Sequence, residues 1–356
     1  MELIKRLFFI FIILISSLKS CAIEEILPDF KEEETFLQKL TAQKEIKLSE
    51  QDTIQFGVNF KGSTDFTIYN NDNGRFASSY PYSIEPYIYS KFGEGKYESR
   101  IGIVPTRDTS KYDNKVFGII SDIYIIRHLN EKHKVLIGNS RVPIGYEGKE
   151  SHYELPFAQR SQIATNIGDA RSLGVRFMGE ISKFDYDVGG YFATRNLQHF
   201  NDGGEFVGWL DYSPFKDKET SPFKNLKVGG GLQYGRSGEN YTVLSTGAKW
   251  NYKKEFATIE YAFAQNYNGH YGFKEAKAQG ANITIGHNLT DKLQLVGRYD
   301  IFNPNMKKSD NIIAQYSLGL NWFIIGKRLR LTLDYIFEQQ KNNNKNKIMF
   351  MTQFMI

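Results

Sequence analysis

The sequence predicts an all-β fold, a transmembrane antiparallel β-barrel of about 16 strands with a short N-terminal helix. Apolar and polar residues alternate with a period of two from residue 52 onward. The connections between these segments are alternately long and short, which is typical of outer-membrane barrels. No apolar run after residue 20 is long enough to span a bilayer as a helix.

The composition agrees with such a barrel. Aromatic residues make up 15% of the 356 residues, with 22 tyrosines and 27 phenylalanines. Membrane barrels use aromatic residues as girdles at both lipid–water interfaces. Cys21 is the one cysteine, so no internal disulfide is predicted.

Residues 1–22 have the pattern of an export signal. A positively charged start precedes an apolar stretch at 7–15, and small residues surround a cleavage site after Ala22. The apolar stretch is too short for an uncleaved membrane anchor. Lipidation at Cys21 is the alternative, although Lys19 fits a lipidation signal poorly.

Residues 23–50 form a second segment, which we expect to be a helical lead-in in the periplasm. Asp29 and Glu32 have the spacing of a helix-capping box. A solvated helix or flexible lead-in is favoured over a weak coiled-coil seam between subunits, because few helical turns support the seam. Residues 51–356 then form the transmembrane barrel.

Sixteen segments of the barrel domain alternate in the manner of strands. They are residues 53–69, 80–92, 95–106, 115–128, 132–142, 170–182, 184–195, 205–214, 226–236, 241–252, 255–266, 277–288, 291–302, 312–324, 329–339 and 347–355. Counted from the first strand, odd connections are long and even ones are tight, with 237–240 and 215–225 as exceptions. This pattern places both chain ends in the periplasm and the longest connection, 143–169, on the outer side.

The inward faces of these strands carry many charged residues. In the segment 329–339, for example, Arg330 and Asp334 lie opposite Leu331 and Leu333 in the alternation. A soluble β-sandwich also alternates, but so many charges would be prohibitive in a dry core. Barrels of sixteen to eighteen strands enclose an aqueous channel, whereas about eight strands are filled by side chains. We therefore expect a wet lumen.

Two stretches carry a resemblance to a known family. Residues 137–145 lead a glycine-containing strand into a Pro-x-Gly turn, and residues 171–179 are followed by a second glycine-rich strand at 186–191. They resemble bacterial outer-membrane porins, in particular the phosphate-selective porin O/P type. The resemblance implies a sixteen-stranded barrel, usually a homotrimer, with a constriction loop that begins at this turn. Small hydrophilic solutes cross the outer membrane through such barrels.

The sequence departs from that family in two respects. Barrels of this type usually end in Phe, whereas Ile356 is the last residue here, although Phe350 and Phe354 still share one face with it. Selection of phosphate needs an uninterrupted ladder of arginines, and here the inward arginines alternate with carboxylates. We therefore do not extend phosphate selectivity to this chain.

The predicted function is a porin in the bacterial outer membrane, a water-filled channel for passive diffusion of small hydrophilic solutes and ions. The loop 143–169 is expected to fold into the lumen as its constriction. Acids of the loop would then face arginines of the wall across the bore and create a transverse electric field. We expect the constriction to prefer neither ion strongly, with a mild preference for anions from the wall. The predicted pore-lining and constriction residues are Arg100, Arg141, Glu147, Glu150, Arg160, Asp169, Arg176, Arg195, Lys249, Arg298 and Arg330.

Other classes of function have less support. The alternative is a non-conducting barrel that serves as an adhesin or structural anchor, which would need much longer outer loops. The six histidines are scattered and no nucleophile, zinc or phosphate-loop motif occurs, so no enzyme, cofactor or metal site is predicted. Basic residues alternate along strands instead of clustering, so nucleic-acid binding is not expected. The expected partners are outer-membrane lipid and lipopolysaccharide, two further copies of the chain, and solutes or inorganic ions.

Overall fold

The computed structural model describes residues 44–69, 76–105, 119–168, 170–192, 203–237, 239–267, 277–341 and 343–356. The expected signal peptide, the greater part of the expected helical lead-in, and Asp169 and Arg195 of the predicted pore lining lie outside these residues. Within the described ranges, no helix is both long and apolar enough to cross a membrane.

Strands dominate the described chain. They are β1 (Lys44–Lys47), β2 (Thr53–Tyr69), β3 (Phe76–Ser79), β4 (Tyr82–Phe92), β5 (Tyr97–Ile103), β6 (Ile120–His128), β7 (His133–Arg141), β8 (Arg171–Ile181), β9 (Phe184–Phe192), β10 (Gly204–Tyr212), β11 (Lys227–Ser237), β12 (Glu239–Tyr252), β13 (Glu255–Gln265), β14 (Lys277–Asn288), β15 (Leu293–Asn303), β16 (Ile313–Lys327), β17 (Leu329–Gln339) and β18 (Lys345–Met355). The short helices are α4 (Tyr146–Lys149), α5 (Gln162–Asn166) and the 3₁₀ turn η2 (Ser309–Asn311).

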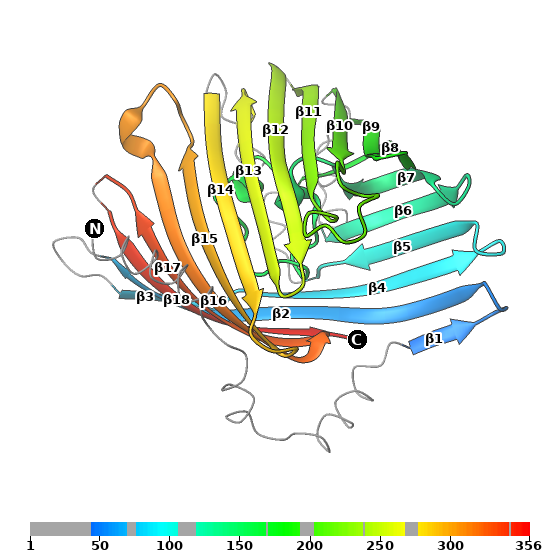
Figure 1. The fold of residues 1–356 in the computed structure, drawn as a ribbon, viewed down its shortest axis with the longest axis horizontal. Helices are drawn as coiled ribbons and strands as arrows, with labels where there is room; N and C mark the ends of the chain where they lie inside the picture. Colours follow the sequence, from blue (N-terminus) through cyan, green and yellow to red (C-terminus); the bar gives the residue numbers. More distant parts are fainter. Residues whose placement is uncertain are drawn as a thin grey trace.

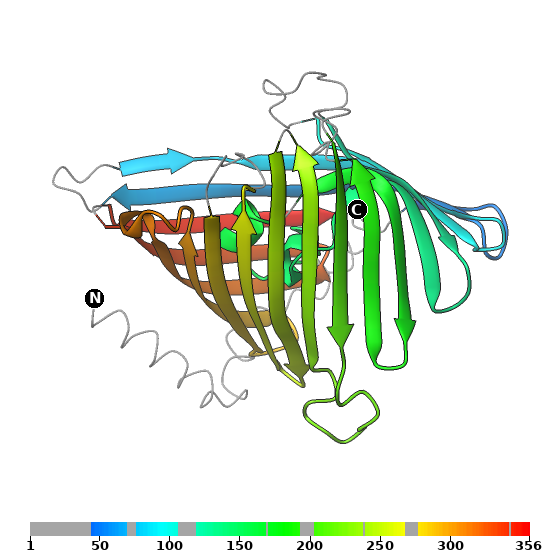
Figure 2. The same cartoon turned by 90° about the horizontal axis from the view of Figure 1, so that it is seen from above.

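The strands form one sheet that closes on itself (Figures 1 and 2). Successive strands pair antiparallel, and the ring closes where β18 pairs with β2, with Thr352 opposite Gly62. β3 and β4 both pair with β2 and together make one strand of the ring, while β1 pairs with the first residues of β2. The described residues thus form a closed barrel of 16 antiparallel strands, which confirms the predicted fold.

The two faces of the barrel differ as the alternation predicts. Across the closing pair of strands, Phe66 and Ile348 lie opposite each other and are 41% and 48% exposed on the outer surface. On β17, Arg330 and Asp334 point inward and are 1% and 0% exposed. Leu333 lies between them in sequence and is 49% exposed. The barrel is therefore apolar outside and charged inside.

Three local differences from the predicted elements have physical causes. The strand predicted at 80–92 is β4, which begins at Tyr82, and a further strand, β3, lies in the predicted connection before it; Pro81 separates the two because it has no N–H for the sheet ladder, while its carbonyl accepts a bond from the Ser63 N–H. β12 begins at Glu239, so its connection to β11 is a tight hairpin. Residues 44–47 form strand β1 instead of helix, because their backbone completes the edge of β2 beyond the end of β18.

Candidate functional site

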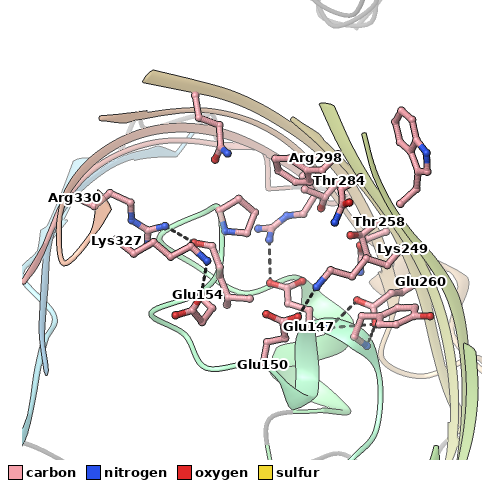
Figure 3. A pocket seen from close by; sticks show the side chains of 18 of the residues that line it. Glu147, Glu150, Glu154, Lys249, Thr258, Glu260, Thr284, Arg298, Lys327 and Arg330 are labelled. Atoms are coloured by element: carbon pink, nitrogen blue, oxygen red, sulfur yellow. Dashed lines mark hydrogen bonds and ion pairs between the residues drawn. The ribbon is translucent and has the colours of Figure 1, made fainter. Parts of the chain in front are cut away.

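The segment between β7 and β8, described at residues 142–168 and 170, lies inside the barrel and is called the lumen loop below (Figures 1 and 3). It carries α4 and α5. Both begin where the chain turns sharply: Gly145 precedes α4 with a φ of 72°, and the Ser161 side chain accepts a bond from the Ala164 N–H at the start of α5. These turns direct backbone N–H groups toward the barrel wall.

Three buried carboxylates of the wall accept hydrogen bonds from backbone N–H groups of the loop. Glu260 on β13 accepts from Tyr146 and Glu147 at the start of α4, which suits the partial positive charge of a helix N-terminus. Asp300 on β15 accepts from the N–H of Gln162 at 2.5 Å, at the start of α5. Asp334 on β17 accepts from the N–H of Ala158 at 2.8 Å. The carboxylates stand on alternate strands, so they fix the loop at three separate points.

Two buried arginines of the same wall bind the loop carbonyls. Arg298 on β15 donates to the carbonyls of Gln159 at 3.1 Å and Arg160 at 3.4 Å. Arg330 on β17 donates to the carbonyl of Leu155 at 2.7 Å. Both arginines are 1% exposed, so they lie beneath the loop and do not face an open bore. Both still line an inner cavity beside the loop, and their role in lining the pore stays a prediction.

Three ion pairs cross from the loop to this wall around a cavity of about 270 Å³ (Figure 3). Glu147 lies 3.5 Å from Arg298, Glu150 lies 2.5 Å from Lys249, and Glu154 pairs with Lys327. Acids of the loop were expected to face arginines across an open bore. Instead they form direct pairs on the side of the lumen that the loop occupies.

Apolar contacts complete this attachment. Phe157 is 1% exposed, with the Arg298 guanidinium 4.6 Å from the centre of its ring. Ile163 packs against Gly280 on β14, where an added Cβ would lie 2.5 Å from the Ile163 side chain. The glycine thus leaves room for a loop side chain. We call the inward faces of β12–β17 the anchoring wall.

The lumen loop is also braced internally. Arg160 donates to the carbonyls of Glu147 and Glu150, the second at 2.6 Å, and so ties the start of α5 to α4. Arg160 was predicted to line the constriction, and the structure places it within the loop as a structural link. These bonds join the two halves of the loop.

His152 occupies the middle of the loop, with its ring 3.9 Å from that of Tyr153. Its carbonyl accepts a bond from Lys61 at 3.1 Å. Burial and the nearby cations Lys61, Arg141 and Arg160 lower the pKa of His152 to about 2. The imidazole is therefore neutral near pH 7.

The opposite side of the lumen carries a group of arginines on β5, β7 and β8, namely Arg100, Arg141, Arg171 and Arg176, called the arginine cluster below. Arg171 donates to Asp122 at 2.9 Å, and Arg100 lies 3.7 Å from the same carboxylate. All four line a cavity of about 510 Å³ between the loop and the β2–β8 side of the barrel.

Lys149, at the end of α4, lines three of the inner cavities. It lines the 510 Å³ cavity and two others, of about 450 and 730 Å³, at the end of the barrel where the even connections lie. Its ammonium is 3.3 Å from Asp211 and 4.7 Å from the centre of the Trp209 ring. The pairing with Asp211 and the indole hold this cation at the junction.

Of the predicted set, the structure brings Arg100, Arg141 and Arg176 together in the arginine cluster. It places Glu147, Glu150, Lys249, Arg298 and Arg330 at the contact between loop and anchoring wall. The sequence analysis missed Arg171, Asp122 and Lys149. Strict alternation along residues 170–182 would put Arg171 on the face of Leu173 and Val175, whereas it pairs with Asp122 at the strand end beside the loop. The position of Arg171 directly after the loop was the available signal.

No family model and no curated protein sequence matches the chain. Solved structures do. The loop-L8 deletion mutant of OmpT, an outer membrane protein of Vibrio cholerae, matches with a TM-score of 0.61 at 11% identity, covering 86% of this chain and 100% of that one. The outer membrane channel DcaP of Acinetobacter baumannii has a TM-score of 0.58 at 9% identity, covering 87% and 99%. The anion-selective porin from Comamonas acidovorans has a TM-score of 0.57 at 12% identity, covering 85% and 100%.

These similarities establish the fold. The chain has the closed sixteen-stranded β-barrel that bacterial outer-membrane porins have. The narrower resemblance to phosphate-selective porins stays a prediction.

Proposed function

We propose that this protein is a porin of the bacterial outer membrane, a water-filled channel for the passive diffusion of small hydrophilic solutes and ions. One observation carries the proposal: the closed barrel is apolar on its outer face and lined by charged side chains inside. The apolar outer surface suits contact with lipid. The closed ring of strands also leaves no unpaired backbone groups facing the lipid. A lumen lined by arginines and carboxylates suits water.

The lumen loop acts as the constriction in this proposal. Backbone hydrogen bonds, buried arginines and ion pairs attach it to the anchoring wall. A loop that lay outside the barrel in solvent would make none of these contacts. The space left beside it is bounded by the arginine cluster. Solutes then pass on that side.

The rest of the proposal follows from this location. Residues 1–22 would be the cleaved export signal and 23–50 the periplasmic lead-in. The long connections would face outward among lipopolysaccharide. The porin family resemblance supports a homotrimer and, at its narrowest, kinship with phosphate-selective porins.

Single-channel conductance in a planar lipid bilayer tests the proposal. The purified protein should give stepwise openings, in groups of three if it is a trimer. Deletion of residues 151–163 should increase the conductance of each step, because it removes the central part of the lumen loop. A deletion within the outer connection 304–312, which lies away from the loop, should leave the step size unchanged.

Stable insertion without conductance would contradict the porin proposal and favour the alternative of a non-conducting adhesin or anchor. The outer connections 304–312 and 340–344 are longer than the turns at the other end of the barrel, but they weigh against that alternative because an adhesin needs still longer, extended outer loops to contact a partner.

A further inference from the structure

The cavity of about 270 Å³ between the lumen loop and the anchoring wall, called the wall pocket below, is accessible from one end of the barrel. Four of the residues that line it also line the 730 Å³ cavity at the end where the even connections lie, namely Tyr146, Glu150, Lys249 and Asn251. A solute can therefore reach the wall pocket from that end.

Toward the other end, the lumen loop closes the wall pocket. Glu260, Asp300 and Asp334 fix the loop backbone to the wall at this level. Behind Glu260, beside Ser245 and Ala262, a cavity of only about 10 Å³ is left, room for about one water molecule. The wall pocket is therefore a recess in the lumen and not a passage through the barrel along this wall.

The charges around the wall pocket are balanced and already paired. Four acids and four bases line it: Glu147, Glu150, Glu154 and Glu260, and Lys249, Arg298, Lys327 and Arg330. The three acids of the loop form ion pairs with bases of the wall, and Arg330 donates to the carbonyl of Leu155. A charged solute would have to displace one of these contacts and leave a buried charge without its partner, which is costly. A neutral solute would not.

Two hydroxyl groups lie on the wall between two of these bases (Figure 3). Thr258 on β13 and Thr284 on β14 are direct cross-strand partners, with Lys249 beside the first and Arg298 beside the second. Carboxylates of the loop hold both bases. Each hydroxyl can donate and accept a hydrogen bond, so this part of the pocket suits a ligand with hydroxyl groups of its own.

Apolar side chains complete the lining. Phe256 on β13 and Phe323 on β16 face Leu155 and Pro156 of the loop across the pocket. Gly286 on β14 leaves room for the Phe256 ring, since an added Cβ would lie 2.0 Å from that ring. Apolar surfaces with a few polar groups among them are typical of pockets for small molecules.

We propose that the wall pocket binds a small uncharged polyhydroxyl solute of about monosaccharide size. Its hydroxyl groups would bond to the threonines and to the paired charges without displacing a partner, and its C–H groups would pack on the phenylalanines. The volume is just below the range of about 300–1,000 Å³ that is usual for ligand pockets, which indicates a small ligand. Because such a ligand would contact both loop and wall, its binding would stabilise the attached loop. The inference goes beyond the channel function and does not depend on it.

Saturation-transfer NMR with D-glucose tests the proposal on the purified whole protein in a detergent without a sugar headgroup. We expect saturable binding with a Kd of about 1–10 mM, as for a small ligand of modest affinity per atom. D-glucuronate, which has the same ring with a carboxylate, should bind about ten-fold more weakly. Absence of saturable glucose binding would overturn the pocket, and equal binding of glucuronate would overturn the uncharged class. Neither result would alter the conductance that tests the channel.

Two variants locate the binding. Thr258→Phe fills the wall pocket and should abolish glucose binding, while Thr284→Val removes one hydroxyl at similar volume and should weaken it about five-fold. Glucose should also slow proteolysis of the lumen loop in the parent but not in Thr258→Phe. Unchanged binding in Thr258→Phe would place the glucose elsewhere and contradict the proposal. If that variant does not fold, unchanged binding in Thr284→Val would do so.

Thr246 provides the matched controls. It lies on β12 next to Ser245 in sequence but is exposed on the outer face, as Leu244 is. Thr246→Phe and Thr246→Val make the same chemical changes away from the lumen and should bind glucose like the parent. Losses equal to those at Thr258 and Thr284 would show a general effect on the barrel and would overturn the assignment to the wall pocket.

Discussion

The lumen has two sides that use the same residue types for different purposes. On the anchoring wall, Arg298 and Arg330 are 1% exposed and donate to carbonyl groups of the loop. In the arginine cluster, the side chains of Arg100 and Arg176 are 21% and 14% exposed and lie beside carboxylates of neighbouring strands. Covered guanidinium groups hold the loop, whereas the partly exposed ones pair with carboxylates of the wall.

This difference teaches that an inward position in a barrel does not by itself make a residue pore-lining. Once a loop fills part of the lumen, the residues beneath it behave like those of a protein core. Their hydrogen bonds must then come from protein groups, and the loop backbone donates one to each of Asp300 and Asp334. The comparison gives four predictions.

The largest effect is expected from Arg298→Ala. The change removes the donors to Gln159 and Arg160 and leaves Glu147 without its partner. Removing one member of a buried pair costs about 3–5 kcal/mol, which should release the loop from the wall. Limited proteolysis should cut the loop faster and single-channel steps should grow. Arg100→Ala on the other side should leave the loop protected; equal cleavage would contradict the difference between the sides.

Phe157→Ala should loosen the loop without a change in charge. The ring is 1% exposed, and truncating a buried Phe costs about 3 kcal/mol, or less where the surroundings collapse. Conductance should rise while the permeability ratio stays near that of the parent. Phe177→Ala, at an outward position 48% exposed, serves as the control for proteolysis. If the loop of the Phe157 variant is cleaved no faster than that of the parent, the polar bonds alone are enough to hold the loop on the wall.

Glu260→Gln should have a smaller effect. The neutral amide still accepts one bond from the start of α4, but it loses the charge that suits a helix N-terminus. Weakening a cap of this kind costs about 1 kcal/mol. Hydrogen exchange of the amides of Tyr146 and Glu147 should accelerate about five-fold. Exchange at the parent rate would show that the carboxylate is not needed there.

The smallest effect is expected in the pH dependence of loop release. The pKa of His152 is lowered from 6.5 to about 2 in the folded loop, so its protonation favours the released loop. The stability that the neutral imidazole contributes is complete above pH 6.5 and falls as the pH drops from there toward 2. His152→Gln should therefore make cleavage of the loop less sensitive to acid. The measurement compares cleavage at neutral and mildly acid pH in both proteins, and identical acid sensitivity would exclude His152 as a contributor.

The fold was predictable because alternation and connection length act strand by strand. Arg330 and Asp334 were placed inward correctly from the alternation of a single segment. The roles of individual charges were not, because they depend on which wall the loop contacts, and that contact joins residues such as Glu147 and Arg298 that are 151 positions apart. Arg171 was missed because it is the first residue of β8, and alternation predicts the direction of a side chain poorly at the end of a strand.

The closing seam between β2 and β18 has a consequence for how the molecule forms. Ile356 exchanges backbone hydrogen bonds with Val58 on β2 across this seam, and its carbonyl also accepts a bond from Tyr87 on β4, 269 positions away. The ring cannot be completed until the segment carrying β18 has reached the one carrying β2, so the entropy of closing a very long loop must be overcome first. Contacts between such distant positions make folding slow, and unpaired strand edges remain exposed meanwhile. We therefore expect barrel assembly to depend on factors that keep the chain unfolded until its last strand is available.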